Sequence, residues 1–427
     1  MANIAIFNFS PVYFKGKWQN LHYYNSIISA FKKRKHNVVS FITNDIICDP
    51  WNGNNISISR DVEHQVKITL KKFKPDLIIC FNNSKINIIE EFDCPIAIWE
   101  ADTVKYFSDK DSIKKNVDRY HFIYFTQNGA KEIVDFFQAQ RKNIFYIENA
   151  TSIQSKKIKK FYDISFIGSL YDTDKFSNIK KSDHNYTDYI SATERKKILL
   201  SLIANDLKIY TNQVPYSYHS LKKYNKISNE MIFDTNQVEK VMNQSLISLN
   251  HSHHQARNIG YSWRVLDILA SNSLLITEKS TLLSEKFGKN IKQQFYSSAY
   301  DVRKKCEYFL NNKNAMHDLI AEQNNVINTY YRWEDRIKKI EDIFQLKNEK
   351  KKVSTNKIFR KEILIKTPFL IALFIYLNSS FKILKAGLNS SFKILKAGIV
   401  NKNLMKKKTI LYRFLVRYRY FKNRTLR

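Results

Sequence analysis

Short apolar runs recur along the first third of the chain at the spacing of buried strands. Six runs have this character: Ile4–Phe9, Val38–Ile42, Leu77–Phe81, Ile96–Trp99, Phe122–Phe125 and Ile144–Ile147. Amphipathic patterns typical of helices separate them. Because strands that alternate with helices at this spacing pair in parallel, the pattern predicts a doubly wound α/β sheet in a Rossmann-like domain over residues 1–152.

The same alternation begins again after a charged connector, Lys156–Lys160. Four more runs have the length of strands: Asp163–Tyr171, Leu207–Tyr210, Ser245–Asn250 and Leu274–Thr277. Helical patterns follow over Ala299–Leu310 and Met316–Leu346. We therefore predict a second Rossmann-like domain over residues 153–346.

Residues 347–427 differ from the rest of the chain in composition. They contain 22 Lys and Arg against two acidic residues, which is +20 of the net charge of +32. An 11-residue repeat, Asn378–Leu388 and Asn389–Ile399, makes about three helical turns per copy, so both copies present the same face. This pattern predicts a basic amphipathic appendage that binds an anionic membrane surface through residues 366–427. The alternative is a helical appendage that packs on its own protein.

Length and composition leave room for these three parts. A chain of 427 residues with 44% hydrophobic residues can bury two separate cores. Its four cysteines lack metal-type spacing, and three lie in or beside apolar runs, so we expect reduced thiols in a cytosolic protein. The N-terminus enters a strand pattern without a basic region or cleavage site, so no secretion signal is expected.

The candidate chemistry is concentrated between the runs Ser245–Asn250 and Leu274–Thr277. A helix is expected to begin near Ser262, whose hydroxyl can cap its first turn. Arg264 lies in that turn, where the helix dipole disfavours a cation unless an anion such as a diphosphate is bound. Asp267 lies three residues further on and can accept hydrogen bonds from ribose hydroxyls. The alternative is a surface Arg264–Asp267 ion pair, which contributes about 0.2–0.5 kcal/mol.

These residues resemble the donor-binding segment of GT-B glycosyltransferases, in particular the CgeB-like group and the group 1-like enzymes. That segment has a strand ending in Leu-Asn, an Arg-x-x-Glu that opens a helix, and a strand ending in Thr-Asp. The matching residues here are Leu249-Asn250, Arg264 with Asp267, and Thr277-Glu278. Asp267 replaces the glutamate and is one methylene shorter, and Ile259 stands where many related enzymes carry a second acid. The resemblance implies two Rossmann-like domains and a terminal helix that packs back across both.

The resemblance also assigns further donor contacts. Ile167-Gly168-Ser169 matches the element that approaches the donor phosphates, and Tyr210 is expected in the nucleobase pocket. Polar and small residues between the two strands are assigned to the donor as well: Asn250, His251, His253, Gly260 and Ser262. The alternative for this histidine-containing loop is a plain exposed loop. Since the histidines lack a third or fourth partner at ligand spacing, no metal site is expected.

Acceptor chemistry is expected at the end of the run Ile96–Trp99. The family carries a Trp-x-x-Asp sequence in this region, and Trp99 to Asp102 matches it. This makes Asp102 the candidate catalytic base that takes the proton of the acceptor hydroxyl. Trp99, Glu100 and Gly16, the glycine of the loop after the first strand, are assigned to the acceptor side. The alternatives are that Asp102 caps the next helix and that Gly16 forms an ordinary turn.

The pattern and the resemblance together predict a glycosyltransferase that needs no metal or other cofactor. It would transfer sugar from a nucleotide-sugar to a surface-glycan acceptor (lipopolysaccharide, capsule or a lipid-linked saccharide) at the cytoplasmic face of a bacterial membrane. One alternative is a polyanion-binding protein, but the charge is concentrated in a tail with apolar faces and no nucleic-acid motif occurs, so no nucleic-acid partner is expected. The other is a GT-B-like scaffold without activity, which the altered motif at Asp267 favours.

Overall fold

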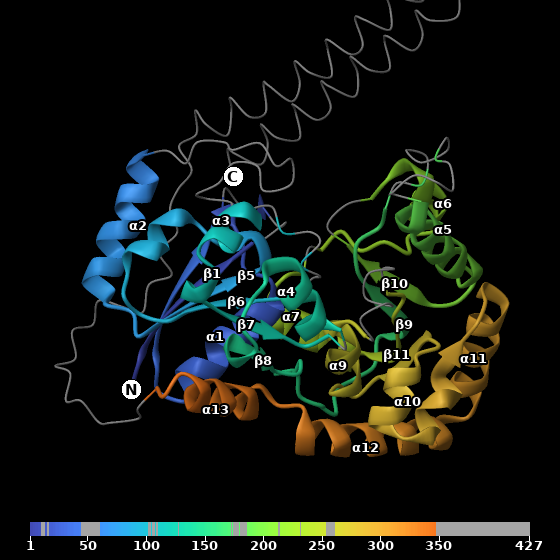
Figure 1. Cartoon of the computed structure of the whole chain (residues 1–427). Helices are drawn as coiled ribbons and strands as arrows, with labels where there is room; N and C mark the ends of the chain where they lie inside the picture. Colours follow the sequence, from blue (N-terminus) through green and yellow to red (C-terminus); the bar gives the residue numbers. More distant parts are fainter. Residues whose placement is uncertain are drawn as a thin grey trace, which may run out of the picture.

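The computed structural model describes residues 1–346 except for 10–12, 15–16, 44–59, 101–103, 105–106, 108–109, 127, 172, 174–178, 180–185, 212–213, 231 and 253–260. Four of the predicted site residues lie outside the described residues: Gly16, Asp102, His253 and Gly260. The predicted basic appendage, residues 347–427, also lies outside them. The described part of the chain forms two α/β units side by side (Figure 1).

The N-terminal unit contains a six-stranded parallel sheet with the strand order β4-β1-β5-β6-β7-β8. Its strands are β1 (Asn3–Asn8), β4 (Asn37–Ile42), β5 (Leu77–Phe81), β6 (Ile96–Trp99), β7 (Tyr120–Tyr124) and β8 (Ile144–Tyr146). Its helices are α1 (His22–Lys33), α2 (Arg60–Phe73), α3 (Lys110–Lys115) and α4 (Gly129–Phe137). A short antiparallel hairpin, β2 (Tyr13–Phe14) and β3 (Lys17–Trp18), follows β1. All six strands predicted from the apolar runs are therefore present.

The C-terminal unit contains a five-stranded parallel sheet with the order β10-β9-β11-β12-β13. Its strands are β9 (Tyr162–Ile167), β10 (Leu207–Tyr210), β11 (Ser245–Leu249), β12 (Leu274–Glu278) and β13 (Phe295–Tyr296). Its helices are α5 (Tyr186–Ser201), α6 (His219–Lys223), α7 (Thr235–Asn243), α9 (Trp263–Leu269), α10 (Thr281–Phe287) and α11 (Ala299–Asn311). The edge strand β13 was not predicted, because two residues carry no periodic signal.

Each sheet is covered on both faces, which explains why its strands are mostly apolar. Alternate residues of β1 enter different cores: Ala5 and Phe7 face one, and Ile4 and Ile6 face the other. The C-terminal sheet also separates two cores, with Leu274 and Ile276 in one and Leu275 in the other. Since all the ladders are parallel, the loops after the strands of one sheet meet at a single edge, and the candidate residues belong to such loops.

The terminal helical region crosses from one unit to the other. The predicted single helix over residues 316–346 is wrong, because α12 (Lys313–Tyr330) and α13 (Trp333–Ile343) are separate helices. The break occurs where Arg332 pairs with Thr151 in an isolated parallel bridge. Trp333 then enters the core of the N-terminal unit, so the expected packing of the terminal helix across both units is confirmed (Figure 1). Residues 333–343 thus lie on the N-terminal unit, although they follow the C-terminal one in sequence.

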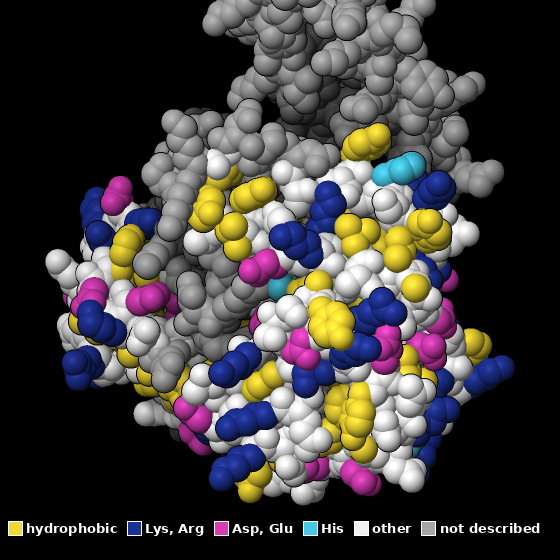
Figure 2. Space-filling view, turned by 90° about the vertical axis from the view of Figure 1, so that its right-hand side faces the viewer, with side chains coloured by type: hydrophobic (Ala, Val, Ile, Leu, Met, Phe, Trp, Pro, Cys, Tyr) yellow, Lys and Arg dark blue, Asp and Glu magenta, His cyan; other side chains and the backbone are white. Residues whose placement is uncertain are grey.

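The face shown in Figure 2 does not have the strong charge bias that residues 347–427 have in composition. On the face shown in Figure 2, where the C-terminal unit is turned towards the viewer, lysine and arginine side chains are interspersed with acidic ones. Among the described residues, no helix is both long and apolar enough to cross a membrane. The same residues contain no group of three or more His, Cys, Asp or Glu placed to hold a metal ion.

Candidate functional site

Helix α9 carries two of the predicted donor-binding residues. Its backbone enters from an extended Ser262, and the helix buries Val265, Leu266 and Leu269 in the core beneath the C-terminal sheet. The predicted capping by Ser262 is wrong, because its hydroxyl bonds no group of the first turn and instead donates to Asn250 Oδ1 at 3.5 Å. Burial of the apolar face therefore holds this helix in place.

The Arg264 side chain reaches the loop that follows β9. Its guanidinium donates a hydrogen bond to the backbone carbonyl of Ile167, directly before the predicted phosphate-binding pair Gly168-Ser169. Burial lowers the pKa of Arg264 from its ordinary value, while nearby Asp267 raises it and nearby Arg195 lowers it again. The predicted Arg264–Asp267 surface ion pair is wrong, because the Asp267 carboxylate bonds other residues.

Arg195 on α5 is a second cation at this loop, and it was missed in the sequence. Its side chain is buried, and it donates to the carbonyls of Ser169 and His251, each at 2.7 Å. These two bonds tie the loop after β9 to the loop after β11. The guanidinium carbon also lies 5.8 Å from the Phe166 ring centroid and 5.2 Å from that of Tyr171. In the sequence, Arg195 lies within Glu-Arg-Lys-Lys, a charged run that is typical of a solvent-exposed helix face.

The two arginines together form a positively charged edge. Within the part of the chain that the structure describes, both donate to backbone carbonyls and neither forms an ion pair with a carboxylate. Arg195 Nε is buried without a hydrogen-bond partner there. A Cβ on Gly168 would lie 2.8 Å from the Phe166 ring, so glycine is what allows this ring to lie under the turn. Two neighbouring guanidiniums with neutral partners favour binding of a multivalent anion.

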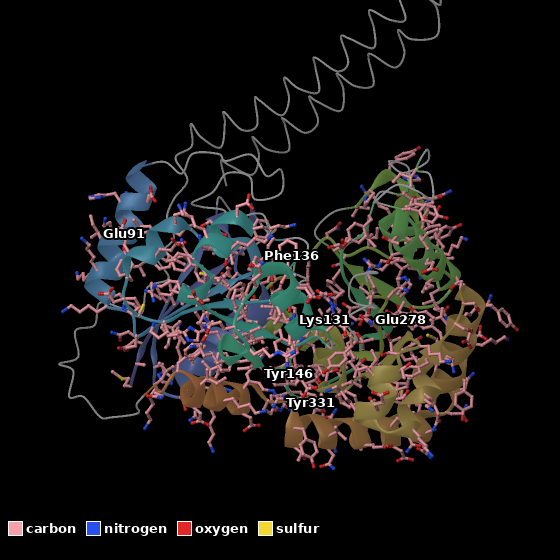
Figure 3. All side chains as sticks on the ribbon, in the orientation of Figure 1. Glu91, Lys131, Phe136, Tyr146, Glu278 and Tyr331 are labelled. Carbon is pink, nitrogen blue, oxygen red and sulfur yellow. The ribbon has the colours of Figure 1, made fainter. Side chains whose placement is uncertain are left out.

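The loop after β11 is fixed by a buried hydrogen-bond network. Asn250 Nδ2 donates to Thr277 Oγ1 at 2.9 Å, and His251 Nδ1 lies 2.7 Å from the Tyr296 hydroxyl. Glu278, which is labelled in Figure 3, lies at the end of β12. Its carboxylate accepts the Ser252 N–H at 2.7 Å. Asn250 and His251 therefore lie at the predicted edge of the sheet, but their polar atoms hold the loop together. The prediction of direct donor contacts is not supported for the Asn250 amide, which is engaged within the protein.

Asp267 points towards the N-terminal unit. One carboxylate oxygen accepts a hydrogen bond from the Thr151 hydroxyl at 2.6 Å, and the other lies 2.7 Å from His22 Nε2. The carboxylate is buried, and His22 is the first residue of α1. In this structure the carboxylate makes two bonds that join α9 to the other unit, and the ribose contact stays a prediction. The partners are 116 and 245 residues away in sequence, so no local pattern indicates them.

Tyr210 does not join the candidate site. Its ring is buried, and its hydroxyl donates to Tyr162 at 3.2 Å. Tyr162 begins β9, whereas Tyr210 ends β10 and pairs with Ile167 at the other end of β9. The side chain therefore leans away from the edge where the donor is expected. Burial and the bond to Tyr162 raise the pKa of Tyr210, which agrees with a structural hydroxyl.

The predicted acceptor-side residues Trp99 and Glu100 are buried in the N-terminal unit. Trp99 is 0% exposed and packs between Phe81, at a ring distance of 5.2 Å, and Trp333, at 6.0 Å. Glu100 is 1% exposed, and a Cβ on Gly129 would lie 2.9 Å from its Oε2, which places the carboxylate at the start of α4. Neither side chain is exposed at the surface of this structure, and their assignment to the acceptor side stays a prediction. Trp99 completes a core, and Glu100 places negative charge where the dipole of α4 favours it.

Comparisons with known proteins agree with this geometry. Residues 195–342, which begin at Arg195 and include α9, match the family model described as "Glycosyl transferase-like". No curated protein matches the chain in sequence.

Three solved structures illustrate the likeness. Sucrose-phosphate synthase from Thermosynechococcus elongatus is similar over 81% of this chain and 99% of its own, with 10% identity and a TM-score of 0.52. T4 phage BGT, a β-glucosyltransferase solved with UDP and Mn2+, is similar over 80% of this chain and 99% of its own, with 11% identity and a TM-score of 0.50. For TarM the identity is 14% and the TM-score 0.43, over 65% of this chain, and the chain spans 57% of the length of TarM.

The fold and the family match together define the class of the protein. The chain has the GT-B fold, with two Rossmann-like α/β domains, as the sequence predicted. The predicted resemblance to GT-B glycosyltransferases is confirmed, and the family match and the fold support sugar transfer. The finer resemblance to the CgeB-like group stays a prediction.

Proposed function

We propose that the protein binds a nucleotide-sugar through the edge formed by Arg195, Arg264 and the turn Gly168-Ser169, and transfers its sugar to a glycan or lipid-linked acceptor. The observation that carries this proposal is the convergence of two guanidiniums on one turn, that of the buried Arg195 and that of the half-buried Arg264. A pyrophosphate bridge would place several acceptor oxygens against their free N–H groups. Charge-assisted hydrogen bonds of this kind are about twice as strong as neutral ones.

The same cations would also assist the chemical step. When the bond from the sugar to the diphosphate breaks, negative charge grows on the leaving oxygen. Guanidiniums that are already in place stabilise that charge without further reorganisation. The acceptor hydroxyl must lose its proton in the same reaction. Asp102, three residues beyond the last residue of β6, keeps its assignment as the base in this proposal.

The reaction is proposed to proceed without a bound metal or other cofactor. T4 phage BGT was solved with UDP and Mn2+, so metal dependence is an explicit arm of the test for this chain. The acceptor is proposed to lie at a membrane surface, because the 22 Lys and Arg of residues 347–427 and their amphipathic repeat fit an anionic bilayer.

A thermal-shift screen tests the donor. The full chain is heated with UDP, GDP, CMP and dTDP sugars, each with and without Mn2+, and one nucleotide should raise the melting temperature. A ligand at 100 times its dissociation constant adds about 2.7 kcal/mol to the free energy of unfolding. Inorganic pyrophosphate serves as a probe of the two-arginine edge alone.

The alternatives are outcomes of the same screen. A chain that melts cooperatively but gains no stability from any nucleotide or from pyrophosphate would favour the inactive scaffold. A chain that ignores these ligands but binds duplex DNA or RNA with a steep salt dependence would favour the polyanion-binding protein.

A further inference from the structure

Helix α9 contacts three different parts of the molecule within five residues. Trp263 points into aromatic rings of the N-terminal unit, with ring centroids 4.6 Å from Tyr23 and 5.8 Å from Trp333. Arg264 bonds the turn after β9 in the C-terminal unit. Asp267 bonds His22 and Thr151. Figure 1 shows α9 at the centre of the molecule, between the two sheets.

The contacts of Asp267 are well suited to fix the helix. Thr151 lies where the chain leaves the N-terminal unit, and its backbone pairs with Arg332 where the chain returns to it. His22 begins α1, and its carbonyl accepts a hydrogen bond from Thr235 at the start of α7 at 3.1 Å. One carboxylate therefore connects α9 to the segment that joins the two units and to the first helix of the N-terminal unit.

We propose that Asp267, Thr151 and His22 are positioning residues that hold Arg264 against the diphosphate-binding turn and couple this site to the N-terminal domain. The inference rests on the proposed function, since it concerns the same anion site. It gives Asp267 a role other than the ribose contact expected from the motif. Both oxygens of the carboxylate are bonded inside the protein, at 2.6 Å to Thr151 and at 2.7 Å to His22, so these partners fix its position. Any change in the bonds shifts the first turn of α9, where Arg264 lies.

Thr151→Val tests the coupling without changing charge. The substitution keeps the shape of the side chain and removes the hydroxyl that donates to Asp267 Oδ1. The ligand is inorganic pyrophosphate, which has no ribose, titrated into the full chain by calorimetry. The same hydroxyl also accepts the Ile153 N–H at 3.0 Å, a bond within the segment that joins the two units, so the substitution removes two hydrogen bonds. We expect the dissociation constant for pyrophosphate to rise about three- to tenfold, as for loss of the one bond that holds Asp267. A ribose-binding Asp267 would predict no change for this ligand.

A matched control separates positioning from loss of stability. Glu341→Gln alters another buried carboxylate, which lies 2.7 Å from His36 and joins α13 to the N-terminal sheet away from the anion edge. This variant should be less stable but bind pyrophosphate as the wild type does. If both variants weaken binding equally, the effect is a general loss of stability and the proposal is overturned.

Amide hydrogen exchange provides a readout that does not depend on the ligand. In Thr151→Val, exchange should accelerate in residues 263–269 and also at the start of α1, which belong to different units. Glu341→Gln should leave both segments unchanged. Unchanged exchange in Thr151→Val would overturn the coupling even if pyrophosphate binds. If the wild type binds no pyrophosphate but Thr151→Val still exchanges faster in both segments, the coupling stands and the anion site is rejected.

Discussion

Removing the Arg264 guanidinium should cost donor affinity much more than it costs the fold. Arg264→Ala deletes one charge-assisted hydrogen bond to the diphosphate, which is worth about 1.5–3 kcal/mol. Because 1.4 kcal/mol is a factor of ten, the dissociation constant should rise between about tenfold and 150-fold. Within the protein, the Ile167 carbonyl loses one donor, but the repulsion between Arg264 and Arg195 also disappears. The free energy of unfolding should therefore fall by only about 1–2 kcal/mol.

The assay is calorimetric titration of the full chain with pyrophosphate and with the nucleotide-sugar that stabilises the wild type. Arg303→Ala is the matched control, because Arg303 is an exposed arginine of α11 that pairs with Glu307 at 2.7 Å. That variant should bind as the wild type does. An Arg264→Ala protein that is folded and binds both ligands with wild-type affinity would refute the assignment of this edge to the diphosphate.

Three further predictions concern other parts of the chain. Asp102→Asn should lower kcat about 10²–10⁴-fold with little change in donor affinity, and normal turnover with a lower Tm would support helix capping instead. A chain truncated after residue 346 should keep donor binding but no longer sediment with anionic vesicles, whereas full-length protein should be only partly released by salt. Burial raises the pKa of Glu341, but hydrogen bonds from Arg34 and His36 outweigh burial and hold the pKa below its ordinary value of 4.5. The ionised Glu341 therefore stabilises the fold above pH 4.5, and this stabilisation is lost as the pH falls through the folded-state pKa. Denaturant unfolding should show Glu341→Gln less stable by about 1.5–3 kcal/mol at neutral pH, with a gap that closes in acid, and a gap independent of pH would contradict this reasoning.

Most of the fold could be predicted from local pattern. Every long strand of both sheets lies in a mainly apolar run, because parallel strands buried on both faces favour apolar residues. The break between α12 and α13 could not be predicted, since Tyr331-Arg332 contains neither Pro nor Gly. It depends on the pairing of Arg332 with Thr151, a contact made only when both units are folded.

The site could be located but not assembled from the sequence. Arg264 and Gly168-Ser169 were placed at one edge, and the structure joins them through the Ile167 carbonyl. Arg195 was missed, because its carbonyl partners leave no mark in the sequence. Asp267 was predicted to contact the ribose. The sequence could not indicate its bond to His22, because that residue lies in the other domain. Trp99 was assigned to the acceptor side, although a position at the end of a buried strand is equally typical of a core aromatic residue.

The central claim is that a nucleotide-sugar binds with its diphosphate between Arg195 and Arg264. It is tested most directly by a structure of the full chain determined with the donor that stabilises it. The account predicts diphosphate oxygens at about 2.7–3.2 Å from a guanidinium nitrogen of each arginine, over the turn Gly168-Ser169. A well-ordered donor whose diphosphate contacts neither arginine would contradict it.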